Sequence, residues 1–114
     1  MYVRWKRRLA ARGNLVLTAA LVRSERRNGK PRQTVVAYLG SVNDLVLKHI
    51  LRRNAFWEEV NRRLDALVLD PLQRKKIESN LASMVSRPSP EEVAKAQRDF
   101  EKAQREFEEF LGPL

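Results

Sequence analysis

Hydrophobic and polar residues alternate along the first forty positions in a pattern that predicts β-strands. In the opening segment, "YVRWKRRLA", the cations Arg4, Lys6 and Arg8 share one side of such a strand. The second segment starts apolar on both sides, which indicates a central strand. We therefore expect strands at residues 2–10, 14–26 and about 32–39.

The dipeptide Asn28-Gly29 joins the last two strands and favours a two-residue type I′ turn, because both residues tolerate positive φ. Pro31 follows it and lacks a backbone N–H, which an edge strand accommodates. The register that this turn sets pairs Arg27 with Lys30, Glu25 with Arg32, Val22 with Val35 and Leu21 with Val36.

From residue 41 the apolar spacing changes to steps of three and four, which predicts helices. The first is expected over about 44–68, capped by Ser41 or Asn43, with Arg53-Asn54 as a candidate break. Asp70 and Pro71 begin a second helix. Ser89, Pro90 and Glu92 begin a third, over 90–111, with a capping box.

The third helix carries one apolar position every three or four residues, the spacing of a heptad seam. This stripe either packs on the first helix or forms an interface with a second copy or another protein, in which Phe100, Phe107 and Phe110 would take part. Its members are Val93, Ala96, Phe100, Ala103, Phe107 and Phe110.

These elements indicate an α+β fold, a three-stranded antiparallel β-meander followed by three helices. The chain has 114 residues, which suits one domain, 1–114. Within it we distinguish a basic sheet region (1–42), a helical region (43–87) and a C-terminal amphipathic helix (88–114).

Charge is distributed unevenly. The formal net charge is +9, and residues 1–40 alone hold ten Lys or Arg against one acid, Glu25. Residues 88–114 hold four basic and seven acidic side chains. A cationic surplus concentrated in one third of a chain favours a polyanionic partner.

The sequence contains no set of residues with the types and spacing of a known catalytic site. Cysteine is absent, His49 is the single histidine, and "RNGKP" lacks the further glycines of a phosphate loop. We therefore expect no enzyme activity, no metal and no cofactor. No apolar run approaches the ~20 residues that span a bilayer, so we expect no membrane association and a cytoplasmic location.

The basic hairpin is the candidate contact element, because arginine binds phosphate and guanine edges through a planar, bidentate fork. Gln33 and Asn28 are candidate readers of base edges, and Trp5 and Tyr38 either stack on unpaired bases or belong to the core. The predicted nucleic-acid-binding residues are Arg4, Lys6, Arg8, Arg23, Arg26, Arg27, Lys30, Arg32 and Gln33.

The segment "VRSERRNGKPRQTVVAYLGSVNDL" resembles the N-terminal basic hairpin of DDE-type insertion-sequence transposases and of small uncharacterised mobile-element proteins. The matching positions are Arg26 or Arg27, Gly29, Lys30, Arg32, Gln33, Leu39 and Gly40. The resemblance covers about 25 residues and implies DNA handling in a bacterial mobile-element or phage context. It does not imply strand transfer, for which the chain lacks the length of the catalytic core.

Three functions remain open. Duplex DNA binding is the first, and it predicts outward arginines on one continuous face. A protein-interaction module, such as an accessory or inhibitor subunit, is the second, and it predicts phenylalanines in a solvent-facing row. RNA binding through the sheet face and Trp5 is the third.

Overall fold

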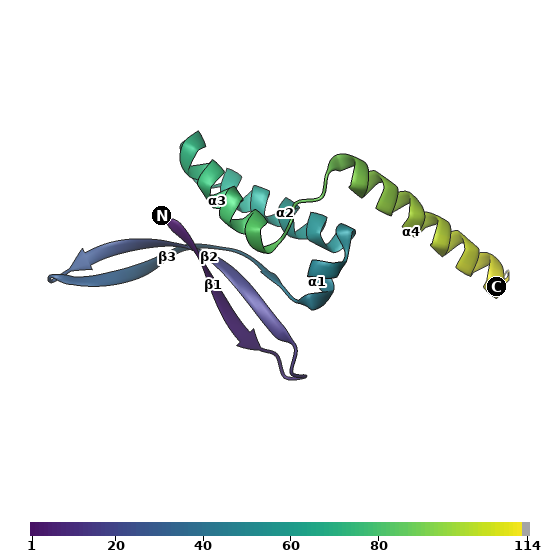
Figure 1. Cartoon of the computed structure of the whole chain (residues 1–114), viewed down its shortest axis with the longest axis horizontal. Coiled ribbons are helices and arrows are strands. Elements are labelled where there is room, and N and C mark those ends of the chain that lie inside the picture. Colours follow the sequence, from purple (N-terminus) through teal and green to yellow (C-terminus); the bar gives the residue numbers. More distant parts are fainter. Residues whose placement is uncertain (113–114) are drawn as a thin grey trace.

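The computed structural model describes residues 1–112 and shows an α+β fold in which a three-stranded antiparallel sheet precedes four helices (Figure 1). The predicted fold class is thus confirmed. The strands pair in the order β1-β2-β3. The elements are β1 (Tyr2–Leu9), β2 (Leu15–Arg27), β3 (Lys30–Val42), α1 (Asp44–Lys48), α2 (Ile50–Asp65), α3 (Pro71–Met84) and α4 (Pro90–Leu111).

The first predicted helix is in fact two helices, and the predicted break at Arg53-Asn54 is wrong. The chain breaks at His49, which has an extended backbone (φ −115°, ψ 123°) between α1 and α2. This change of direction lets Val46 and Leu47 pack against the same core as the buried residues of α2. Asn43 is the cap of α1, and its Oδ1 accepts from Val46 N at 3.0 Å.

The hairpin turn is confirmed: Asn28 (φ 53°) and Gly29 (φ 76°) both lie in the left-handed region. The predicted register holds from Arg27–Lys30 as far as Val22–Val35. It is wrong at the next pair, because a bulge leaves Val36 without a partner and Leu21 pairs with Ala37. A second shift follows between Ala19 and Ala20.

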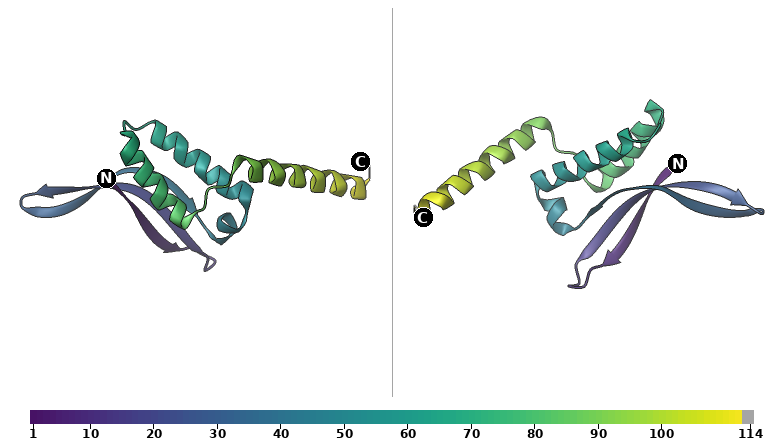
Figure 2. Two further views of the ribbon diagram at one scale, coloured as in Figure 1. Left: turned by 45° about the horizontal axis from the view of Figure 1, so that its top comes forward. Right: turned by 180° about the vertical axis from the view of Figure 1, so that it is seen from behind.

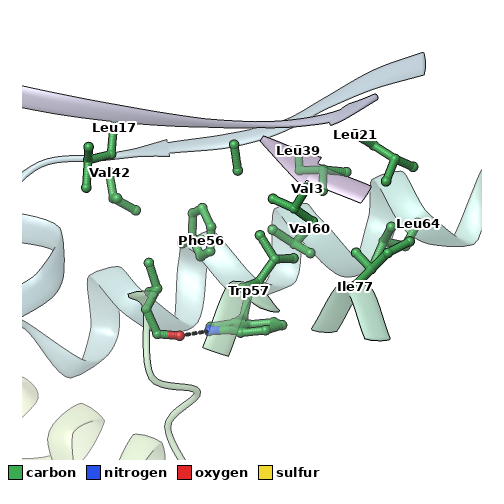
Figure 3. Close-up of a cluster of buried hydrophobic side chains, with 13 residues drawn as sticks. Val3, Leu17, Leu21, Leu39, Val42, Phe56, Trp57, Val60, Leu64 and Ile77 are labelled. Carbon is green, nitrogen blue, oxygen red and sulfur yellow. Dashed lines mark hydrogen bonds between the residues drawn. The ribbon is translucent and has the colours of Figure 1, made fainter. Parts of the chain in front are cut away.

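The core lies between one face of the sheet and the helices (Figure 3). Leu21 and Leu39 project from the sheet towards Val60 and Leu64 of α2, and all four are fully buried. The indole N–H of Trp57 donates to a backbone carbonyl after α3, Val85 O, at 3.0 Å. Burial of such side chains contributes about 1.5–3 kcal/mol each, so this layer holds the helices on the sheet.

Two parts extend away from this core. The hairpin of β2 and β3 continues past β1 as a two-stranded ribbon, and α4 points away at the opposite end (Figures 1 and 2). The molecule measures 69 × 36 × 24 Å along its principal axes. The basic hairpin and the C-terminal helix therefore lie at opposite ends of an elongated molecule.

Candidate nucleic-acid interface

The ribbon formed by residues 23–34, called the arm below, pairs only with itself. Every side chain in it is exposed except Glu25, which is half-buried. A turn with two positive φ values closes its tip. Its cross-strand pairs are Arg23–Thr34, Ser24–Gln33, Glu25–Arg32, Arg26–Pro31 and Arg27–Lys30.

Strand alternation distributes the predicted cations over both faces of the ribbon. One face, the Glu25 face, consists of Arg23, Glu25, Arg27, Lys30 and Arg32. The opposite side continues the sheet face that none of the described helices covers, called the outer face below. Its members are Tyr2, Arg4, Lys6 and Arg8 on β1, Val16, Thr18, Ala20, Val22, Ser24 and Arg26 on β2, and Gln33, Val35, Tyr38 and Ser41 on β3.

A hydrogen bond fixes Arg4 on the outer face. Its Nη1 donates across β2 to Gln33 Oε1 at 2.9 Å. The structure therefore brings Arg4, Gln33 and Arg26 to one side, whereas Arg27 and Lys30 belong to the other. The cations of the arm therefore do not form the one continuous face that would favour duplex binding, because a two-stranded ribbon alternates its side chains between two surfaces.

Glu25 lies between two arginines of its own strand. Its carboxylate is 3.8 Å from Arg23 Nη1 and 3.6 Å from Arg27 Nη2, and all three side chains reach solvent. Ion pairs of this exposure contribute at most about 1 kcal/mol. Glu25 thus orients two guanidinium groups and removes one unit of charge from its face.

Of the two alternatives for Trp5, the structure shows packing against the core. Its ring stacks on Phe56 with centroids 6.5 Å apart, and its indole N–H donates to Asn80 Oδ1 at 3.1 Å. Tyr38, by contrast, is 59% exposed on the outer face. Tyr2 lies on the same face and is 40% exposed. The sequence could have identified Tyr2 as a surface residue, because it shares one side of the predicted first strand with Arg4.

Arg63 of α2 also contributes to this region, and no sequence pattern signalled it. Its Nη1 donates to the carbonyl oxygen of Tyr38 at 2.7 Å, across 25 positions of sequence. Its Nε donates to Glu59 Oε1 at 2.6 Å. The guanidinium therefore satisfies an acceptor on the edge of β3 and fixes this strand against α2.

The C-terminal stripe does not pack on the first helix over most of its length. Val93 and Ala96 are half-buried, but Phe100, Phe107 and Phe110 are 58%, 61% and 86% exposed. The expectation of internal packing is thus wrong for the phenylalanines, because α4 diverges from the body after its first turns (Figure 2).

Within residues 1–112, no cluster of three or more His, Cys, Asp or Glu side chains could hold a metal ion. In the same part of the chain, no helix has the length and apolarity to cross a bilayer. No known protein family, curated protein or solved structure matches the chain. Function is therefore inferred from the arm and its surroundings.

Proposed function

We propose that this chain is a non-enzymatic protein that binds nucleic acid, double-stranded DNA first, through the arm. One observation carries the proposal: a two-stranded ribbon projects from the body with cations on both faces and one acid, Glu25. Structural stability does not require this concentration of charge, since the core lies elsewhere. Binding of a polyanion would account for this concentration of charge.

The dimensions of the arm suit duplex DNA. The major groove is about 12 Å wide and admits a two-stranded β-ribbon. The cations lie on two surfaces and not on the one continuous face first expected of a duplex binder, but a ribbon that enters the groove on edge presents both of its faces to phosphates. Arg26 and Arg27 are adjacent near the tip and point to opposite sides, so they would reach opposite groove walls, while Gln33 lies further back with Arg4.

The transposase-like residues of the hairpin support the same proposal. The turn residue Gly29, with Lys30 and Arg32, belongs both to the resemblance and to the exposed arm. A mobile-element or phage context is the setting that we propose for this DNA handling.

Fluorescence anisotropy with labelled duplex DNA, single-stranded DNA and hairpin RNA, titrated across salt, tests the proposal. The variant R26A/R27A/K30A should weaken duplex binding and reduce the log–log salt slope by about 2–3, since each phosphate contact contributes roughly 0.9. A matched control, R52A/K75A/K76A, removes the same charge from exposed helix positions. Equal losses in both variants would refute a specific role for the arm, and tighter binding to RNA would favour the RNA alternative.

A second candidate function, protein interaction through α4, has its own observation: the exposed row of Phe100, Phe107 and Phe110. The two functions are compatible, because the arm and α4 lie at opposite ends of the molecule (Figure 1).

The charges beside this row constrain self-association. Glu92, Asp99 and Glu106 flank it on one side, and Gln97 and Gln104 flank it on the other. Parallel pairing of two copies would set each acid opposite a glutamine, whereas antiparallel pairing would set acids opposite acids. Sedimentation equilibrium tests this candidate: a dimer that F107S/F110S converts to monomer supports self-pairing, and a wild-type monomer leaves only a different protein as partner.

A further inference from the structure

From the outer face of the sheet we infer a stacking platform for unpaired bases, so that the preferred ligand is a duplex with an adjoining single strand. This inference rests on the proposed function and specifies its substrate class. Tyr2 and Tyr38 would supply the stacking surfaces, and Arg4 with its neighbours on β1 would bind the backbone.

The two tyrosines lie on the same face, on either side of the central strand. Tyr2 pairs with Val22, and Tyr38 pairs with Ala20, two positions along β2. Strands are about 4.8 Å apart and residues rise about 3.4 Å each along a strand, so the rings stem from points about 12 Å apart. Between them on β2 lie Ala20 and Val22, two apolar side chains that are 4% and 0% exposed.

The charge of the outer face suits a nucleic-acid strand. Arg4, Lys6 and Arg8 follow one another along β1, all exposed, and Arg26 continues the series on the arm. None of the described residues of this face is acidic. Aromatic rings combined with a basic track are the features by which proteins bind single strands without sequence preference.

A hollow of about 410 Å³ opens beside Tyr38, lined by Thr18, Tyr38, Gly40, Ser41, Glu59 and Arg63. The hydroxyls of Thr18 and Ser41 are 3.0 Å apart, and either can donate to the other. Hydroxyl groups can both donate and accept, so they can exchange this mutual bond for bonds to the edge of a base stacked on Tyr38. A duplex cannot use this site, because its bases are stacked and paired internally.

The arm is continuous with this platform. The bond from Arg4 to Gln33 links β1 to the base of the arm, so a strand leaving a duplex held by the arm would pass directly onto the outer face. One molecule would then contact the paired and the unpaired part of the same nucleic acid.

The test compares a blunt duplex with the same duplex carrying a pyrimidine tail, in a DNA and an RNA version, by anisotropy with the full chain. We expect the tail to raise affinity about tenfold per stacked base. Y2A/Y38A should abolish this gain and leave blunt-duplex affinity unchanged, whereas Y2F/Y38F should retain it. V68A/L72A, which truncates two exposed apolar side chains outside the outer face and outside α4, is the control and should behave as wild type.

Equal affinity of the wild type for blunt and tailed probes would overturn this inference while leaving the role of the arm intact. The inference would also be overturned if Y2A/Y38A still bound the tailed probe more tightly than the blunt duplex. Failure to bind the blunt duplex would instead count against the proposed function. Bromouracil in the tail gives an independent readout: photocrosslinks should map to peptides containing Tyr2 or Tyr38, and crosslinks confined to α4 would contradict the platform.

Discussion

The ring of Phe56 lies directly against Gly40, where any side chain would collide with it. A Cβ at position 40 would be 2.8 Å from Phe56 Cε2. Gly40→Ala should therefore lower the free energy of unfolding by about 1–3 kcal/mol, the usual cost of overpacking. Urea denaturation monitored by tryptophan fluorescence measures it.

A double-mutant cycle separates this collision from any backbone effect of alanine. Phe56→Leu removes the ring, so Gly40→Ala should cost much less in that background. If the two changes were simply additive, the contact between ring and glycine would not be the cause.

Glu25→Gln should strengthen binding of the arm to duplex DNA. The change removes the acid between Arg23 and Arg27 while preserving its size, and the gain should be about twofold to fivefold at moderate salt, corresponding to at most about 1 kcal/mol. Stability should change little, because the ion pairs are exposed. Anisotropy with duplex DNA measures the effect; Glu58→Gln, an exposed helix acid, is the control. Weaker binding in Glu25→Gln would show that orienting the arginines matters more than the charge.

Gly29→Ala should loosen the arm without unfolding the body. Gly29 has φ 76°, a conformation that costs other residues about 1–2 kcal/mol. Since the arm lies outside the core, the urea midpoint should be unchanged while amide hydrogen exchange in residues 24–33 accelerates several-fold. Asn28→Gly keeps a residue that tolerates positive φ and serves as control. Unchanged exchange in Gly29→Ala would contradict the turn geometry.

Acid should weaken the start of α4. Hydrogen bonds from the backbone N–H and hydroxyl of Ser89 lower the pKa of Glu92. A carboxyl with a lowered folded-state pKa stabilises the fold above its unfolded value, about 4.3, and loses that contribution as pH falls through the folded value.

Carboxyl NMR titration checks this. In Ser89→Ala the Glu92 pKa should move up towards its ordinary value, and Ser86→Ala, outside the capping box, should leave it unchanged. Since alanine keeps the backbone N–H, an identical Glu92 titration in wild type and Ser89→Ala would show that this N–H alone, and not the hydroxyl, lowers the pKa.

Local chemistry allowed much of the fold to be predicted. The Asn28-Gly29 turn and the Ser89 capping box depend on residues a few positions apart, and both are present as expected. The bulge at Val36 and the break at His49 could not be predicted, because each depends on how distant apolar side chains share one core.

The candidate site, too, could be predicted only in part. The arm and its cations follow from the turn and from strand alternation, but which face the helices cover does not. Trp5 and Tyr38 are both aromatic residues in strands; Phe56 and Asn80 contact and partly bury the first, whereas the second lies exposed on the opposite face.

The separation of arm and α4 also gives the molecule a permanent electric dipole. The arm, residues 23–34, holds five basic side chains and one acid, whereas residues 88–114 hold four basic and seven acidic ones, and these segments lie at opposite ends of a molecule 69 Å long. In the field of a polyanion the torque on such a dipole turns the arm forward before contact, and the acidic helix trails. Encounters would then be oriented as well as accelerated. The effect should be strongest at low ionic strength, where the Debye length is longest and the charges are least screened.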